Sequence, residues 1–489
     1  MSPRLLRPVQ PAEVGWKLGR AVEPRGGELW VPWDRTAGVI GPQGSGKTLD
    51  LLVPALLDAP GAALVTLTKV DDLLLSLGPR SSGERPCVVL DPFGLVPGLP
   101  EVVWDPVRGC VDPLVAERRA KAFTAGTVKG AVAGGHGNAA ARFYAAEAAK
   151  VLQGFFHAAA LTGGSLEDVL RWVARPLAAS QPEEILREHP HAAGFWDGLL
   201  HAALHGDDRT AGNTVTTVQQ AMSLFFQDEI RRRCVPGPGR PATDIAAVIA
   251  AGGTIYLLGR EDPYASASPL MTAFAEHVLD TALQAANASP WGRLCPPFHA
   301  VLDELPSTAP LPTLRTRMAN ERALGISFIW AAQTWPQLTA VFGEQEARTL
   351  LGLTNNLILF GGSKDVAFNK EISDLIGQVR VARTNWNSGR MGGRQVSGED
   401  IAILTAAEVR QLKERHVLLL AENGAPIIAG LHRCIDGKPG ARLLAGQEAL
   451  RLQVTTDRAH LVSPDARAAA ALVAARRAGL LGEHEGAGQ

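Results

Sequence analysis

The chain has 489 residues, of which 46% are hydrophobic and 20% are charged, and its formal net charge is −1. This balance argues against a protein that binds nucleic acid over its whole surface, so any DNA contact would be local, in a groove or pore. Five scattered cysteines without a CxxC pair argue against a disulfide framework or a cysteine metal site. The sequence contains neither a run of eighteen apolar residues nor a signal-peptide pattern.

Short apolar runs bounded by turn residues predict buried parallel strands, and hence a mostly parallel sheet. They lie at residues 37–40, 62–68, 86–91, 253–258, 298–304, 325–333, 355–361 and 416–422. Helical stretches, for instance 267–287 and 342–352, separate most of them. This alternation predicts an α/β fold with helices covering the sheet.

One block, from residue 112 to 247, breaks this alternation, because it is rich in Ala, Leu and charged residues at helical spacing. Its 14 acidic and 14 basic residues cancel, which argues against an autonomous clamp on duplex DNA. We therefore predict an all-α domain inserted into the α/β core. The predicted division is a lead-in (1–35), the first part of the core (36–111), the inserted all-α domain (112–247), the second part of the core (248–435) and a C-terminal helical tail (436–489).

The segment "GPQGSGKT", residues 41–48, matches the phosphate-binding pattern GxxxxGK[ST] and lies between a predicted strand and a predicted helix. In such a loop, backbone N–H groups and the helix N-terminus hold phosphate oxygens. Lys47 would reach the β- and γ-phosphates of ATP, and Thr48 would hold Mg²⁺. The alternative is a glycine-rich structural turn. The loop residues predicted to bind nucleotide are Gly41, Gln43, Gly44, Ser45, Gly46, Lys47 and Thr48.

A nucleotide site of this kind also needs a carboxylate from a neighbouring strand. The segment "FHAVLDEL", an apolar strand that ends in Asp303 and Glu304, supplies it. Asp303 would lie beside the magnesium ion, and Glu304 would act as general base toward the attacking water. The alternative is an acidic strand end that caps the next helix. The two motifs together favour catalysis of ATP hydrolysis.

With these motifs, the sequence resembles the TraG/VirD-type coupling proteins of type IV secretion and conjugation, which are P-loop ATPases of the FtsK/HerA superfamily. The resemblance rests on "VIGPQGSGKT", "ALVTLTKVDDL", "VLDELPSTAPLPTLRTRMANERALGISFIWAAQTWPQL", "VFGEQEARTLLGLTNNLILFGGSKD" and "LTAAEVRQLKERHVLLL". It covers most of residues 30 to 430. The resemblance implies a RecA-like core with an all-α insertion and ATP and Mg²⁺ as ligands. It also implies a homo-oligomeric ring, which is expected to be a hexamer.

The resemblance also implies roles for two further residues. Gln333, at the end of the strand after Asp303 and Glu304, matches a residue that senses the γ-phosphate. Arg322 matches an arginine that reaches the nucleotide of the neighbouring subunit, for which a planar, permanently charged guanidinium is suited. The alternatives are a strand-end amide for Gln333 and a surface arginine at a helix C-terminus for Arg322.

The implied function is that of a coupling ATPase that recruits and moves single-stranded DNA with an attached relaxase, or a protein substrate, into a type IV secretion channel. Two alternatives are a double-stranded DNA translocase of the FtsK type and a receptor ATPase that recruits effector proteins without moving DNA. The expected location is the bacterial cytoplasm, at the cytoplasmic face of the inner membrane. Since the family's N-terminal membrane helices have no counterpart here, attachment is expected through a partner or a missing anchor.

Three other features give weaker indications. Lys69 follows a predicted strand, and we interpret it as a solvated strand end in preference to a contact with nucleotide or DNA. The segment 385–400 is predicted to be a mildly basic loop, and Arg383, Arg390 and Arg394 in and beside it are candidates for substrate contact. Six histidines lie in the predicted all-α domain, and no metal-ligand set is apparent around them.

Overall fold

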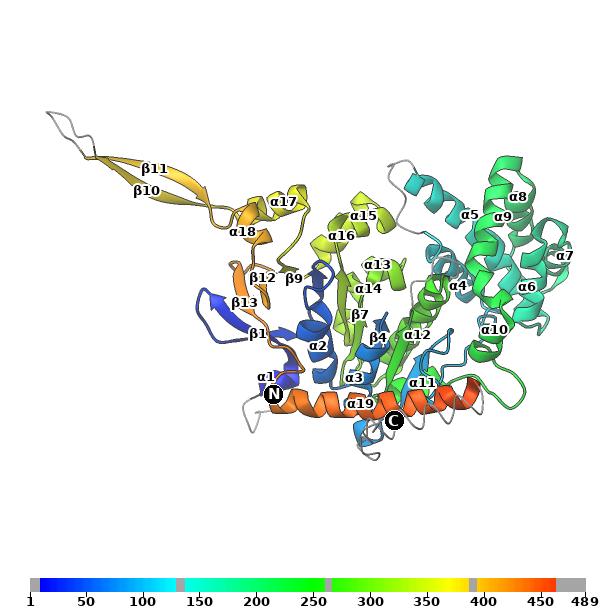
Figure 1. The fold of residues 1–489 in the computed structure, drawn as a ribbon. Helices are drawn as coiled ribbons and strands as arrows, with labels where there is room; N and C mark the ends of the chain where they lie inside the picture. Colours follow the sequence, from blue (N-terminus) through cyan, green and yellow to red (C-terminus); the bar gives the residue numbers. More distant parts are fainter. Residues whose placement is uncertain (1–8, 129–136, 260–265, 387–393, 463–489) are drawn as a thin grey trace, which may run out of the picture.

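A computed structural model describes residues 9–128, 137–259, 266–386 and 394–462. Its centre is an 11-stranded sheet in the order β2-β1-β13-β12-β9-β3-β8-β7-β4-β6-β5 (Figure 1). Seven adjacent strands are parallel, and they confirm the expected α/β fold with a mostly parallel sheet. These strands are β9 (Asn356–Phe360), β3 (Ala37–Ile40), β8 (Ile326–Ala332), β7 (Phe298–Leu302), β4 (Ala63–Leu67), β6 (Thr254–Leu258) and β5 (Cys87–Leu90).

The other four strands of the sheet are antiparallel to their neighbours. They are β12 (His416–Ala421), β13 (Ile427–Gly430), β1 (Gly15–Glu23) and β2 (Glu28–Pro32). The prediction that the run 416–422 is a parallel strand is therefore wrong. Parallel neighbours need a crossover that carries the chain back along the sheet, whereas β12 enters beside β9 in the opposite direction.

The core is divided between the two faces of the sheet. Neighbouring residues of a strand point to opposite faces, so that Leu64 belongs to one hydrophobic cluster and Val65 to the other. Helices α2 (Val53–Asp58) and α3 (Val70–Arg80) cover the Val65 face, and α12 (Ser268–Ala288) covers the Leu64 face. The central strands are buried on both sides, which explains why they are continuous apolar runs rather than alternating ones.

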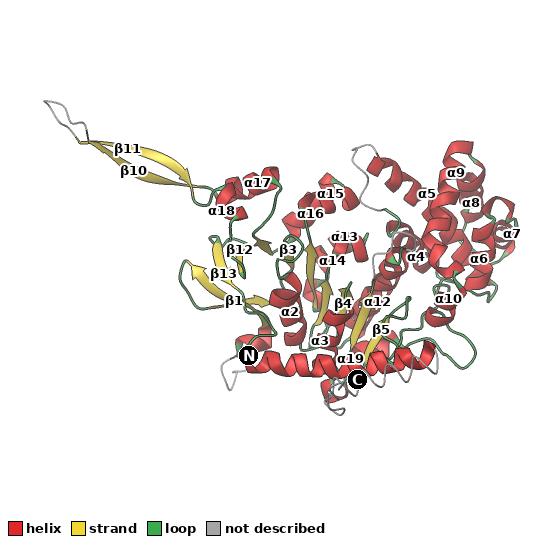
Figure 2. Cartoon of the chain, viewed as in Figure 1, coloured by secondary structure: helices red, strands yellow, loops and turns green. Residues whose placement is uncertain are grey.

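Between β5 and β6 the regular elements of the described residues are all helical, so the expected all-α insertion is confirmed (Figure 2). Its first two helices, α4 and α5, pack against each other, and α4 also packs on α12 of the core. The residue boundaries of the five predicted segments stay a prediction. The helices of this region are α4 (Pro113–Ala125), α5 (Gly137–Leu161), α6 (Leu166–Ala174), α7 (Gln181–Glu188), α8 (Trp196–His205), α9 (Asp208–Met222), α10 (Asp228–Cys234) and α11 (Ile245–Ala250).

The remaining helices surround the sheet. The last of them, α19 (Gly437–Val462), lies across α3, where Arg451 forms an ion pair with Asp71 at 2.8 Å. None of the helices in the described part of the chain is both long and apolar enough to cross a bilayer. The other helices are α1 (Pro11–Val14), α13 (Leu305–Thr308), α14 (Leu314–Asn320), α15 (Trp335–Phe342), α16 (Glu344–Leu353), α17 (Val366–Ile376) and α18 (Ala406–Arg410).

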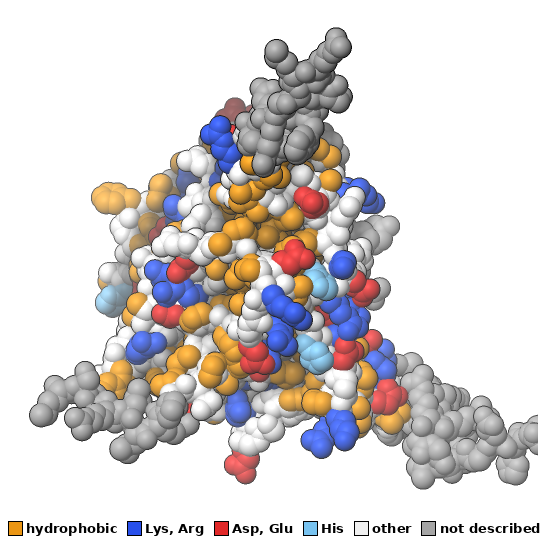
Figure 3. All heavy atoms as spheres, turned by 90° about the vertical axis from the view of Figure 1, so that its left-hand side faces the viewer, with side chains coloured by type: hydrophobic (Ala, Val, Ile, Leu, Met, Phe, Trp, Pro, Cys, Tyr) orange, Lys and Arg blue, Asp and Glu red, His pale blue; other side chains and the backbone are white. Residues whose placement is uncertain are grey.

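A two-stranded arm, β10 (Gln378–Trp386) and β11 (Arg394–Ala402), projects from the body beside α17 and α18 (Figure 1). The prediction of a loop over 385–400 is therefore wrong for the residues that pair in this arm. Figure 3, which faces this side of the molecule, shows hydrophobic side chains gathered at the centre of the face. Among the arm and α17 side chains whose burial is described, the exposed large apolar ones are Val366, Leu375, Val379, Val381, Ile401 and, just after β11, Ile403.

Candidate active site

The phosphate-binding loop joins the carboxyl end of β3 to a π-helical turn, Thr48–Leu52, that continues into α2. Gly44 and Gly46 have φ angles of +78° and +98°, values that glycine adopts without a steric penalty. A side chain at Gly46 would also collide with the carboxylate of Asp50. The glycines therefore permit the tight curl that turns backbone N–H groups inward.

Lys47 is buried at the base of this loop, with 6% of its surface exposed. Its Nζ donates hydrogen bonds to the carbonyl oxygens of Gly41 and Pro42, at 2.6 and 3.1 Å. Burial lowers the pKa of the Lys47 ammonium, and the nearby carboxylates of Glu304 and Asp303 oppose that shift. A negatively charged ligand in the loop would stabilise the ammonium further.

The acidic pair follows β7, whose carboxyl end lies at the same edge of the sheet as that of β3. Thr48 Oγ1 donates a hydrogen bond of 3.1 Å to Asp303 Oδ2, so the two residues predicted to hold magnesium are in contact. Burial raises the pKa of Asp303, while the Thr48 hydroxyl and the Lys47 charge act in the opposite direction. A bound cation would favour the ionised carboxylate.

Glu304 has a φ angle of +50°, which is unusual for a residue with a side chain. Such backbone strain concentrates at functional sites, where the surrounding structure holds it in place. Gln333, which follows β8, donates a hydrogen bond from Nε2 to Glu304 Oε1 at 3.0 Å. The predicted base and the predicted γ-phosphate sensor are thus directly connected.

These groups, apart from Asp303, which contacts Thr48, line a cleft of about 380 Å³, a volume within the usual range for ligand sites. The buried hydroxyl of Ser45 has no hydrogen-bond partner among the described residues, as expected of a group that a phosphate oxygen would satisfy. The residues present therefore fit a nucleotide with Mg²⁺. The lining residues are Gln43, Gly44, Ser45, Gly46, Lys47, Thr48, Leu49, Thr68, Lys69, Asp72, Glu304, Gln333 and Arg433.

The lining includes two basic residues, Lys69 and Arg433, that the sequence did not assign to the nucleotide site. Lys69, interpreted as a solvated strand end, is exposed and also lines the cleft. Arg433, which sequence reasoning missed, comes from the segment after β13 and pairs with Asp50 at 2.7 Å. The Asp50 side chain is fully buried, with 0% exposed, whereas that of Arg433 is 22% exposed. The C-terminal part of the core thereby contributes a cation to the edge of the phosphate loop.

Arg322 does not line the cleft of its own chain. It precedes β8, whereas Gln333 follows it, so the seven-residue strand separates the two by roughly 20 Å at about 3.3 Å per residue. Arg322 Nη1 donates to Asn355 Oδ1 at 3.2 Å. The structure thus unites Lys47, Thr48, Asp303, Glu304 and Gln333 and leaves Arg322 apart from them.

The predicted substrate-contact arginines lie on the projecting arm or outside the described residues. Arg383 forms an ion pair with Glu399 on the opposite strand, at 2.8 Å. Arg394 begins β11, and Arg390 lies outside the described residues. Arg383 is therefore partly neutralised within the arm.

Part of the chain matches a known protein family. Residues 297–414, from the start of β7 to beyond α18, match a family model described as the TraM recognition site of TraD and TraG. The resemblance to TraG-type coupling proteins is confirmed. Among curated proteins, no sequence matches this chain significantly.

Solved coupling-protein structures share the fold. TrwBdeltaN70, a bacterial conjugative coupling protein in an unbound form, superposes with a TM-score of 0.60 at 20% identity over 83% of this chain and 86% of that chain. TrwB in complex with the non-hydrolysable ATP analogue ADPNP superposes with a TM-score of 0.57 at 19% identity, over 82% of this chain and 86% of that chain. TrwB with ADP and Mg²⁺ superposes with a TM-score of 0.57 at 19% identity, over 83% of this chain and 87% of that chain. These superpositions support the expected α/β fold with a helical insertion.

Proposed function

We propose that this chain is an ATP-hydrolysing coupling protein that recruits and moves single-stranded DNA, with an attached relaxase, or protein into a type IV secretion system. The observation that carries the proposal is the convergence of the loop 41–48 with Asp303, Glu304 and Gln333 at one edge of the sheet. A similar fold binds an ATP analogue in one TrwB structure and ADP with Mg²⁺ in another, which supports the same ligands here.

The residues of the cleft suggest how hydrolysis would proceed. Lys47 and the loop N–H groups would hold the β- and γ-phosphates, while Thr48 and Asp303 would hold Mg²⁺, which neutralises charge on the phosphates. Glu304 would orient the attacking water and accept its proton. Gln333, already bonded to Glu304, would align that carboxylate when the γ-phosphate is present.

Ring assembly is part of the proposal. Arg322 lies away from its own cleft, so it could stabilise a transition state only on a neighbouring chain. A hexameric ring would place each cleft between two copies. The apolar side chains exposed on the arm and α17 provide surface for contacts between proteins (Figure 3).

The proposed location is the cytoplasmic face of the bacterial inner membrane, with attachment through a partner or an additional anchor and contact with secretion-channel components. Recognition of TraM is the described role of the matched region in TraD and TraG. The corresponding segment, 297–414, is our candidate for contact with a DNA-processing complex.

ATPase measurements with different DNA ligands test this function. Turnover per chain should rise with protein concentration and increase further with single-stranded DNA. Stimulation by duplex DNA alone would favour the FtsK-type alternative. Turnover that responds to neither DNA nor protein concentration would contradict the translocase function. It would favour the alternative of a receptor ATPase that recruits effector proteins without moving DNA.

A further inference from the structure

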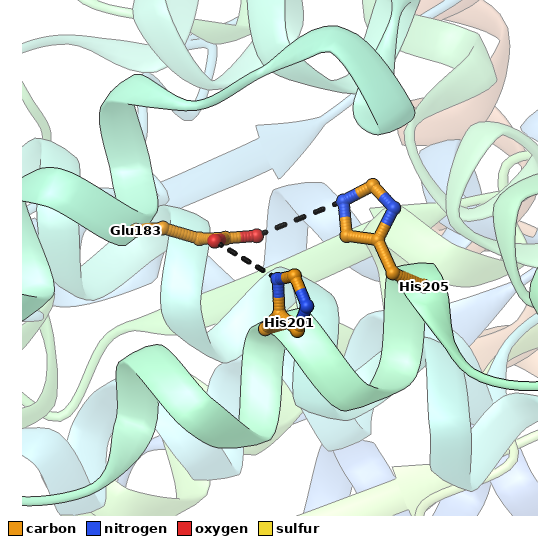
Figure 4. A group of neighbouring side chains, drawn as sticks. All are labelled: Glu183, His201 and His205. Atoms are coloured by element: carbon orange, nitrogen blue, oxygen red, sulfur yellow. Dashed lines mark hydrogen bonds and ion pairs between the residues drawn. The ribbon is translucent and has the colours of Figure 1, made fainter.

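Three side chains that can bind metal meet in the helical region, far along the chain from the proposed ATP site. Glu183 lies on α7, and His201 and His205 lie one turn apart on α8 (Figure 4). Glu183 Oε2 is 3.2 Å from His201 Nδ1, and Glu183 Oε1 is 3.9 Å from His205 Nε2. One ligand atom from each residue lies within 4.8 Å of the others.

The helix geometry explains this arrangement. Residues four apart on a helix share a face, so both imidazoles of α8 point toward the same neighbour. Their ring centroids are 4.8 Å apart. The partner helix α7 presents Glu183 between them, and a second contact, Arg187 to Asp197 at 3.8 Å, joins the same two helices. The framework that would hold a metal is therefore already in place.

The chemistry of the set selects a class of metal. Two neutral imidazoles and one carboxylate form a common protein ligand set for Zn²⁺, with bonds of about 2.0–2.2 Å and a fourth position open to water. Hard ions such as Mg²⁺ and Ca²⁺ prefer oxygen ligands instead. The histidine side chains are 63% and 38% exposed, so an ion could reach them, whereas Glu183 is 14% exposed and held in position.

We propose that Glu183, His201 and His205 bind a divalent transition-metal ion of the zinc type, which cross-links α7 to α8. Small rotations of the two exposed rings would bring the three ligand atoms to the roughly 3.3 Å spacing of a tetrahedral site. Sequence spacing showed no metal-ligand set around the histidines of this region, whereas the structure brings His201 and His205 together with Glu183. The ligands come from two helices, and sequence spacing alone connects only the two histidines.

Zinc binding measured on the full chain tests the proposal. Chelator-treated protein without nucleotide is titrated with Zn²⁺ by calorimetry, comparing wild type with the double variant His201→Ala/His205→Ala. His191→Ala, which removes an exposed histidine of the same region, is the matched control. Cys295 and the ATP site can also take up zinc, but they are identical in all three proteins.

The wild type and His191→Ala should bind one more Zn²⁺ per chain than the double variant, or bind it at least roughly 100-fold more tightly. Zinc should also raise the melting temperature of the wild type more than that of the double variant. Equal stoichiometry, affinity and melting shift in all three proteins would overturn the proposal. His201→Gln, a single change at the more exposed ring, provides the same comparison if the double variant melts early without metal.

Discussion

The hydroxyl of Thr48 donates a hydrogen bond of 3.1 Å to the carboxylate of Asp303, although the two residues are 255 positions apart in the chain. The contact arises because β3 and β7 run parallel in one sheet with β8 between them, so both strands end at the same edge. Ligand sites of open α/β sheets lie outside the carboxyl ends of the strands. The same edge receives Glu304 and Gln333, which makes this contact the anchor of the proposed ATP site.

Replacing Gln333 should slow hydrolysis without abolishing nucleotide binding. Gln333→Ala removes the hydrogen bond that orients Glu304, and we expect kcat to fall roughly 10-fold or more, with a small change in KM. Gln337→Ala, whose side chain accepts from the Gln333 backbone but does not reach Glu304, is the control. A raised KM with unchanged kcat would instead assign Gln333 to binding.

Mixing two inactive variants tests whether Arg322 acts on a neighbouring chain. Arg322→Ala keeps its own phosphate loop, and Lys47→Ala keeps its own arginine, so a mixed ring contains some complete sites. ATPase activity of the mixture should exceed the sum of the separate proteins. Absence of complementation would leave Arg322 with its contact to Asn355, as a structural residue.

Breaking the pair between Arg433 and Asp50 should destabilise the fold. Arg433→Ala leaves a fully buried carboxylate without its cation, at a cost of roughly 3 kcal/mol in the free energy of unfolding. The double variant Asp50→Asn/Arg433→Met should recover part of this loss, because no buried charge remains. Urea denaturation measures both. An unchanged stability of Arg433→Ala would show that water replaces the arginine.

Acid should destabilise the chain partly through His299. Burial in the sheet, together with the charge of Arg80, lowers the pKa of His299 to about 3. Since an unfolded histidine has a pKa of about 6.5, the stability that this group contributes is present above pH 6.5 and is lost as the pH falls toward 3. At about 1.4 kcal/mol per pKa unit, the loss reaches roughly 5 kcal/mol at most.

The variant His299→Gln isolates that contribution, because glutamine does not titrate. It should be less stable than the wild type at neutral pH, since His299 contacts Ser327 and Trp33. Its free energy of unfolding should decline less steeply between pH 6.5 and 4. Parallel pH profiles of the two proteins would show that other groups cause the acid sensitivity.

Much of the core could be predicted from sequence because its strands are buried on both faces. The run 325–332 is apolar except for Ser327, and its residues 326–332 form β8, in which all seven residues are buried. The phosphate loop and the Asp303–Glu304 pair were recognisable because both motifs are local and each follows a strand. The geometry adds that Gln333 contacts Glu304, which spacing alone did not establish.

The features that were missed depend on contacts without a local signal. Arg433 reaches the phosphate loop only because β13 returns beside β12 and β1, which no short pattern near residue 433 encodes. Residues 378–383 and 398–401 of the arm are all exposed, so no burial pattern identifies these strands, and glycines near the tip suggested a loop. The Glu183 cluster forms between two helices, and its register follows from their packing.

ATP turnover by Glu304→Gln, compared with the wild type, shows whether the cleft hydrolyses ATP with Glu304 as its base. Glutamine keeps the size and hydrogen-bonding capacity of Glu304 but cannot accept the proton of the attacking water. We expect the variant to bind ATP with near wild-type affinity and to hydrolyse it at least about 100-fold more slowly. Wild-type turnover in this variant would contradict the assignment of the cleft as the ATP-hydrolysing site with Glu304 as its base.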